Sequence, residues 1–212
     1  MITSRNVYFG LLWFFWLAAS ASAQDQAPAP VFKEGDAWQF NIMSKGQLTS
    51  SSERITGIYE LVLSQGKVKV YEVSGNQKTE LEIKPGGPAD GLAALVGSHE
   101  LRPTLKFPLS VGQKWTYEYE TRPAGAKENQ KRFVEVAVTG MEQVTTSAGS
   151  FKGYRLVRSE KWRGGGRTVV WNGNTITYFY SPETRSVVKS STVSDSGPGS
   201  AETELIKFTP GN

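Results

Sequence analysis

The chain contains no cysteine and a single histidine among its 212 residues. Without cysteine no disulfide can form, and structural zinc sites and most transition-metal sites lack their usual ligands. We therefore predict no metal and no cofactor. The lone histidine, His99, precedes Glu100 in a segment of loop composition. It is either a general base oriented by a carboxylate or, as we favour, an exposed loop histidine, because no serine-nucleophile motif accompanies it.

The chain also has little net charge, with a formal value of +4. The charges are spread along the sequence and form no basic stripe that would neutralise a run of phosphates, so no nucleic-acid partner is predicted. Residues 161–163 (Lys-Trp-Arg) with Arg167 come nearest to a basic–aromatic patch. We interpret them as cross-strand packing with arginine stems lying along apolar surface.

One long hydrophobic run, residues 7–19, follows the single charge of Arg5 and precedes the small residues 20–23. This order is typical of a cleavable signal peptide, so we predict residues 1–23 to be one, with cleavage after Ala23. The run is shorter than the roughly 20 apolar residues of a membrane-spanning helix, which argues against an anchor in the mature chain. With no cysteine at the cleavage site, we expect no N-terminal lipid anchor and a periplasmic or secreted protein.

The rest of the chain is predicted to be one domain. Residues 24–31 are polar and proline-rich, as in a flexible linker. Residues 32–212 are enough to bury a core without disulfides.

Alternating apolar and polar residues predict strands throughout this domain, for example at Trp38, Phe40 and Ile42. Further stripes follow residues 79–83, 115–119, 134–138 and 176–180, and turn residues occur at 75–76, 148–150, 164–166, 172–173 and 181–182. Only residues 89–96 resemble a short helix. The pattern predicts a mainly β fold with very little helix, built as a curved antiparallel sheet, a half-barrel or a sandwich.

Residues 32–84 and 109–208 share a weak internal repeat. Phe32-x-x-Gly-Asp-x-Trp-x-Phe returns as Leu109-x-x-Gly-Gln-x-Trp-x-Tyr, and each copy later reaches a Thr-Glu-Leu segment. The two copies are either related β-meanders that share one core or unrelated segments with the same order of strands and turns.

No motif specifies a reaction. The glycines at 164–166 lie between strand signals, so we interpret them as a hairpin tip and not as a phosphate-binding loop. Glu118 and Glu120 share a strand face with Lys114 and Thr116, as on a solvated surface. A carboxylate pair assembled only in three dimensions remains an alternative, and with it a hydrolase.

The aromatic residues carry the remaining functional signal. They either fill the core between sheet layers, which we favour, or line a concave cavity for an apolar or amphipathic ligand. The candidate ligand-binding residues are Trp115, Tyr117, Trp162, Trp171 and Tyr178.

Three segments in fixed order, residues 107–117 (FPLSVGQKWTY), 138–151 (VTGMEQVTTSAGSF) and 178–189, resemble exported bacterial proteins of unknown function, the TapB-like proteins and their relatives. Ser147 stands where such proteins typically have proline. The resemblance implies a curved antiparallel sheet or half-barrel in the cell envelope and implies no catalytic residues.

Together these observations predict a non-enzymatic protein of the cell envelope that holds an apolar or amphipathic, lipid-like ligand. The first alternative is an assembly module that uses a sheet edge to bind an envelope protein. The second alternative is the hydrolase.

Overall fold

The structure, a computed structural model, describes residues 26–45, 56–84, 88–97, 104–121, 129–163, 171–195 and 199–212. The predicted signal peptide, His99 and the glycines at 164–166 lie outside these residues.

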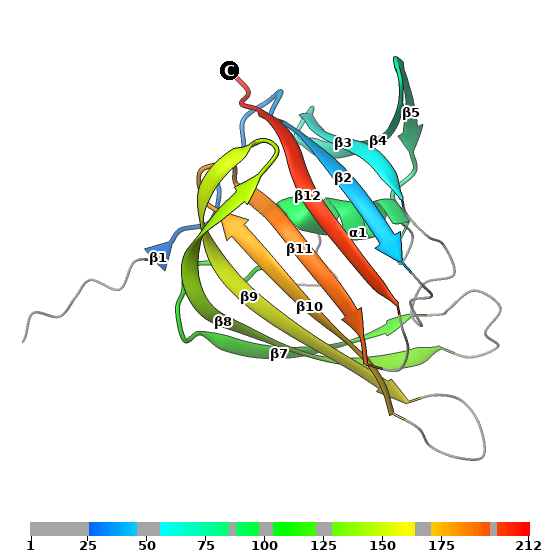
Figure 1. Cartoon of the computed structure of the whole chain (residues 1–212), viewed down its shortest axis with the longest axis vertical. Helices are drawn as coiled ribbons and strands as arrows, with labels where there is room; N and C mark the ends of the chain where they lie inside the picture. The colour runs from blue at the N-terminus through cyan, green and yellow to red at the C-terminus, as the bar shows by residue number, and fades with distance from the viewer. Residues whose placement is uncertain are drawn as a thin grey trace, which may run out of the picture.

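A ten-stranded antiparallel sheet in the order β5-β4-β3-β2-β12-β11-β10-β9-β8-β7 dominates the fold, and β1 and β6 form a separate pair. The sheet is strongly curved but not closed (Figure 1). Its strands are β2 (Ala37–Lys45), β3 (Gly57–Ser64), β4 (Lys67–Ser74), β5 (Gln77–Leu81), β7 (Lys114–Thr121), β8 (Gln130–Thr146), β9 (Gly149–Arg163), β10 (Trp171–Ser181), β11 (Ser186–Ser194) and β12 (Ser200–Thr209). The small pair is β1 (Gln26–Ala27) with β6 (Leu109–Ser110).

This architecture confirms the predicted mainly β fold. The predicted helix is also present, as α1 (Pro88–Ala93) continued by the 3-10 turn η1 (Ala94–Val96). The turn predicted at residues 172–173 was wrong, because these residues lie within β10 and pair with Trp162 and Lys161 of β9. The stripe predicted at residues 79–83 is largely exposed, because β5 is an edge strand of the sheet.

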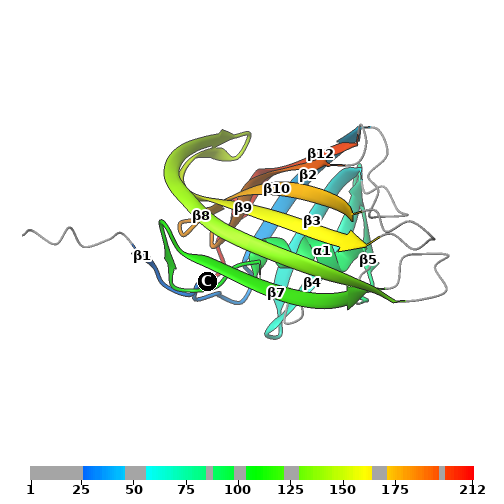
Figure 2. The same cartoon turned by 90° about the horizontal axis from the view of Figure 1, so that it is seen from below.

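One face of the sheet covers α1, and we call it the inner face. Directly paired residues of antiparallel strands point to the same side. One row of paired residues runs from β2 to β8 through Ile42, Thr203, Ser190, Tyr178, Leu156 and Val138. Since Ile42 belongs to the core under α1, the whole row lies on the inner face. Figure 2 shows α1 lying inside the curve of the sheet.

The main core lies between α1, η1 and the inner face of the β2 half of the sheet. Trp38 and Phe40 are fully buried there and pack with Leu92 and Val96 of the helical segment. Trp38 also stacks on Phe208 with 5.9 Å between ring centroids. Alternation along β2 places these aromatic rings on one side, where α1 covers them.

A second core covers part of the β7–β10 half. Leu109 of β6 and Ala27 of β1 are 0% and 2% exposed and pack against Trp115, Val136 and Leu156. Within residues 24–31, the predicted flexible linker, Ala27 pairs with Leu109 and is buried. Tyr178 contacts both cores.

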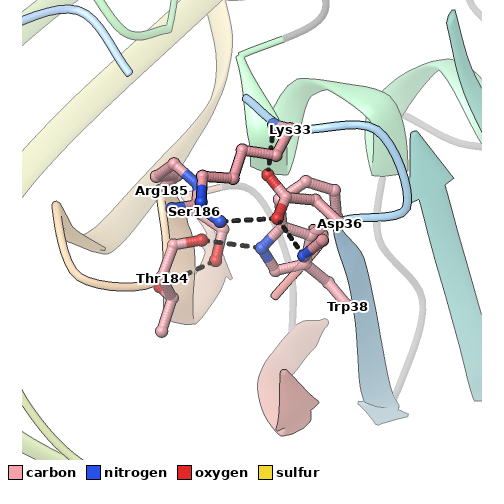
Figure 3. A network of polar contacts seen from close by, with 7 residues as sticks. Lys33, Asp36, Trp38, Thr184, Arg185 and Ser186 are labelled. Atoms are coloured by element: carbon pink, nitrogen blue, oxygen red, sulfur yellow. Dashed lines mark hydrogen bonds and ion pairs between the residues drawn. The ribbon is translucent and has the colours of Figure 1, made fainter. Parts of the chain in front are cut away.

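A network around Asp36 joins the start of β2 to the β10–β11 turn and the C-terminal residues (Figure 3). The fully buried carboxylate of Asp36 accepts hydrogen bonds from Arg185 Nη2 at 2.5 Å and from the Gly211 N–H at 2.8 Å. It also accepts one from the Lys33 N–H at 2.8 Å. Nearby, Trp38 Nε1 donates to the carbonyl oxygen of Thr184 at 2.7 Å. We interpret the network as structural, because its acceptor oxygens, those of Asp36 and Thr184, receive hydrogen bonds from other residues of the chain.

Register shifts in three strand pairs, at residues 138–140, 179–180 and 205–207, help to bend the sheet. Beyond the first shift, the end of the β8–β9 hairpin reaches β12. The Ser147 N–H and Oγ donate to Glu204 Oε1, and the Ala148 N–H donates to the Leu205 carbonyl.

The predicted internal repeat stays a prediction. Its two copies begin at comparable places, since Trp38 and Trp115 lie at the second residue of β2 and of β7. This similarity is equally expected of two unrelated meanders.

Candidate ligand-binding site on the inner face

Three charged side chains are buried on the inner face of β8 and β9. Arg132 is 2% exposed, and Arg158 and Glu160 are each 5% exposed. Charged groups are rarely buried so completely unless they are paired, because removing them from water is costly. We call these three residues with Tyr117, Tyr119 and Tyr178 the inner-face polar cluster.

The strand period explains why these charges point inward. On β9, Arg158 and Glu160 alternate in phase with Leu156 and Trp162, which are 0% and 3% exposed. On β8, Arg132 pairs directly with Trp162 and continues the buried stripe of valines at 134, 136 and 138. The same period that buries the valines therefore buries the charges.

The Glu160 carboxylate is the centre of the cluster. Its Oε2 lies 2.8 Å from Arg158 Nη1, and its Oε1 lies 3.6 Å from Arg132 Nη1. Tyr119 donates its hydroxyl proton to the same Oε1 at 2.5 Å. Two guanidinium groups and a phenol thus compensate the buried carboxylate.

The guanidinium of Arg132 lies over the ring of Trp162, with 3.8 Å from Cζ to the ring centroid. A desolvated cation–π contact of this kind contributes about 2 kcal/mol. This contact gives Trp162 a definite role, because its ring packs against the buried guanidinium of Arg132 and stabilises the positive charge.

Arg158 lies beside two tyrosines. Its Nε donates to Tyr117 Oη at 3.1 Å, and the guanidinium lies near enough to Tyr178 to lower that phenol's pKa against the effect of burial. Burial opposes the charge of Arg158, but the neighbouring Tyr178 and Glu160 raise its pKa above the ordinary value. Burial raises the pKa of Tyr178, with Arg158 acting against the rise. At neutral pH the site therefore holds a charged arginine and a protonated phenol.

The structure brings four of the five predicted ligand-binding residues to this half of the sheet. Trp115 is 8% exposed and belongs to the second core, and Trp162 is buried under Arg132. Tyr117 and Tyr178 are half-buried and reach Arg158. The fifth, Trp171, begins β10 opposite Arg163, and its side chain lies outside the described residues.

A strip of the inner face that includes two tyrosines of the cluster is only half-buried. Ile176 on β10 pairs directly with Arg158 on β9, and the same row of paired residues continues through Thr192 to Ala201. The strip consists of Tyr117, Ile176, Tyr178, Thr192 and Ala201. It offers apolar and hydroxyl groups side by side, next to a buried cation.

Arg132, Arg158 and Glu160 are not among the site residues predicted from the sequence. A signal was present, because these residues fall at the core-facing positions of stripes that otherwise contain valine, leucine and tryptophan. Charged residues in phase with a buried stripe indicate either the end of the core or a polar site within it.

Within the described ranges no group of three or more His, Cys, Asp or Glu side chains could hold a metal ion. No helix in the same ranges is long and apolar enough to cross a membrane. Of the four buried acidic residues among those described, Asp36, Glu60 and Glu160 each contact a cation; the fourth is Asp90 of α1.

No family model matches the chain, and no curated protein matches it. The TapB-like resemblance therefore stays a prediction. Several solved structures match at 12% identity. A predicted lipoprotein from Parabacteroides distasonis matches with a TM-score of 0.44 over 88% of this chain and 100% of its own. A predicted exported protein with a YmcC-like fold from Bacteroides fragilis has a TM-score of 0.40, with 86% and 99% covered. The hypothetical lipoprotein YmcC from Escherichia coli has 0.41, with 82% and 85% covered.

Proposed function

We propose that this chain is an exported, non-enzymatic binding protein of the cell envelope that holds an apolar or amphipathic ligand on the inner face of its sheet. The observation that carries the proposal is the half-buried strip around Ile176 and Tyr178, which shares Tyr117 and Tyr178 with the inner-face polar cluster. Ligand sites typically combine apolar walls with a few well-placed polar groups.

The energetics of the cluster support a role beyond packing. A buried ion pair is often no more stabilising than apolar residues of the same volume, because desolvation offsets the attraction. Valine already occupies the neighbouring inward positions 134 and 136, so apolar residues fit this part of the sheet. Arg158 and Glu160 therefore have no evident packing advantage, and recognition of a polar group on a ligand explains their presence.

The alternatives receive less support. The edge strand β5 bears Lys78 and Glu80, and charges on an edge discourage pairing with another chain. Both side chains are engaged within the sheet, Lys78 with Glu60 and Glu80 with Lys69. For the hydrolase, the contacts of Asp36, Glu60 and Glu160 with cations supply no carboxylate pair.

Titration with the neutral fluorescent probe 1-N-phenylnaphthylamine tests the proposal. The probe should bind the wild-type protein with a blue-shifted, enhanced emission. Ile176→Asp, which places a charge on the half-buried strip, should weaken binding at least about tenfold, because burying an unpaired carboxylate is costly.

The matched control is Thr177→Asp, one residue away on the opposite face of β10, where Thr177 pairs with Val157 and Ser191. This variant should bind the probe like the wild type. Absence of probe binding by the folded wild-type protein, or equal loss in both variants, would contradict a site on the inner face.

A further inference from the structure

The contacts of Arg158 leave two phenol protons available on the half-buried strip. Arginine is a donor only, so Tyr117 accepts a hydrogen bond from Arg158 through an oxygen lone pair, and Tyr178 lies beside the same guanidinium. Each hydroxyl then retains one proton to donate. Among the described residues, no hydrogen bond donated by either hydroxyl is present.

Tyr119 provides the contrast. It is also half-buried and lies two residues from Tyr117 on the same face of β7, with 6.3 Å between the ring centroids. Its hydroxyl proton, however, is donated to Glu160. The cluster therefore contains one phenol that serves the buried carboxylate and two that are polarised by Arg158 and can donate elsewhere.

We propose that Tyr117 and Tyr178, backed by Arg158, bind the carboxylate of a long-chain fatty acid. This inference rests on the proposed function and specifies the polar end of the ligand. Two O–H donors match the two oxygens of one carboxylate, and a hydrogen bond to an ionised acceptor is roughly twice as strong as a neutral one.

The surroundings favour a fatty acid over a free anion. The strip continues from the two tyrosines through Ile176 to Ala201, which gives a hydrocarbon tail half-buried apolar surface. Thr192 lies between them and contributes a methyl group as well as a hydroxyl. A free phosphate would leave this surface unused, and as a dianion it requires more donors than two phenols supply.

The experiment compares cis-parinaric acid with its methyl ester, which has the same chain without the charge. The wild-type protein should bind the acid at least about tenfold more tightly than the ester, as expected when charged hydrogen bonds are lost. In the double variant Tyr117→Phe/Tyr178→Phe, the affinity for the acid should fall to that for the ester. Tyr71→Phe, on β4 at the far end of the sheet, is the control and should retain the preference.

Each other outcome overturns a distinct claim. Equal binding of acid and ester by the wild type would contradict the carboxylate site and leave the proposed function standing. Binding of neither probe would contradict the proposed function itself. Displacement of cis-parinaric acid by millimolar inorganic phosphate would contradict the fatty-acid proposal and would show that the site binds a free anion. The comparison on the wild type decides the proposal even if the double variant does not fold.

Discussion

Arg158 Nε on β9 donates a hydrogen bond to the hydroxyl of Tyr117 on β7, across the intervening strand β8. The two residues are 41 positions apart, and their contact ties the edge strand to the inner face of the sheet. The same guanidinium contacts Glu160 at 2.8 Å. One side chain therefore joins the buried carboxylate to the half-buried strip on which the ligand is proposed to lie.

Glu160→Gln should be strongly destabilising, because it leaves the guanidiniums of Arg132 and Arg158 buried without their carboxylate. Breaking a buried ion pair from one side costs about 3–5 kcal/mol. The free energy of unfolding from urea titration checks this. Glu118→Gln, at an exposed ion pair with Lys131, is the control and should change stability by less than about 1 kcal/mol. Equal effects would show that the cluster is not a coupled buried unit.

Asp36→Asn should lower the free energy of unfolding by about 3 kcal/mol, because the amide cannot replace a carboxylate that accepts from Arg185, Lys33 and Gly211. For a domain of this size, that loss corresponds to a fall in Tm of about 10 °C. Circular dichroism melting measures it. The exposed Asp195→Asn serves as the control, and a matching Tm in the two variants would refute the role of the network.

Gly211→Ala should detach the C-terminal residues from the start of β2. A Cβ at this position would lie 2.2 Å from the Glu34 carbonyl oxygen and 2.7 Å from the Asp36 nitrogen, so backbone would have to move. A cost of about 1–3 kcal/mol is expected. Gly140→Ala, whose Cβ meets nothing within 4 Å, should cost less. Hydrogen exchange at residue 211 gives a local measurement, and unchanged protection would contradict the clash.

The Glu60 carboxylate should make stability depend on pH in the acid range. Burial acts to raise the pKa of Glu60, but hydrogen bonds from Lys78 and Gln39 outweigh it and the pKa is lowered below 4.5. A lowered folded-state pKa gives stability that is present above the unfolded pKa and is lost as pH falls through the folded value. Urea titrations between about pH 3 and pH 6 should show a smaller acid-side loss in Glu60→Gln than in the wild type. Parallel profiles would contradict this contribution.

Much of the fold was predictable, because strand period and turn chemistry are local. Trp38 and Phe40 indicated the buried face of β2, and residues 89–96 indicated the helix. The turn predicted at residues 172–173 was wrong because asparagine and glycine also occur within strands, as they do in β10. The order of the strands was not predictable, since pairing of β2 with β12 joins distant parts of the chain.

The candidate site was only partly predictable for the same reason. Tyr117, Trp162 and Tyr178 were identifiable as aromatic residues on apolar stripes. Their shared contacts with Arg132 and Arg158 depend on the register of β7 to β10, which no local pattern encodes. Glu160 contacts Arg158, 2 positions away in the sequence, and Arg132, 28 positions away. The contact with Arg132 can be predicted only once the pairing of β8 with β9 is known.

Native mass spectrometry of the full-length gene product, exported and purified without detergent, tests the binding of a ligand most directly. Spectra are compared before and after organic extraction, and again after addition of oleic acid. We expect a complex with one lipid-like molecule per chain that is lost on extraction and restored by oleic acid. A bare chain mass before extraction, unchanged by oleic acid while the protein remains folded, would contradict it.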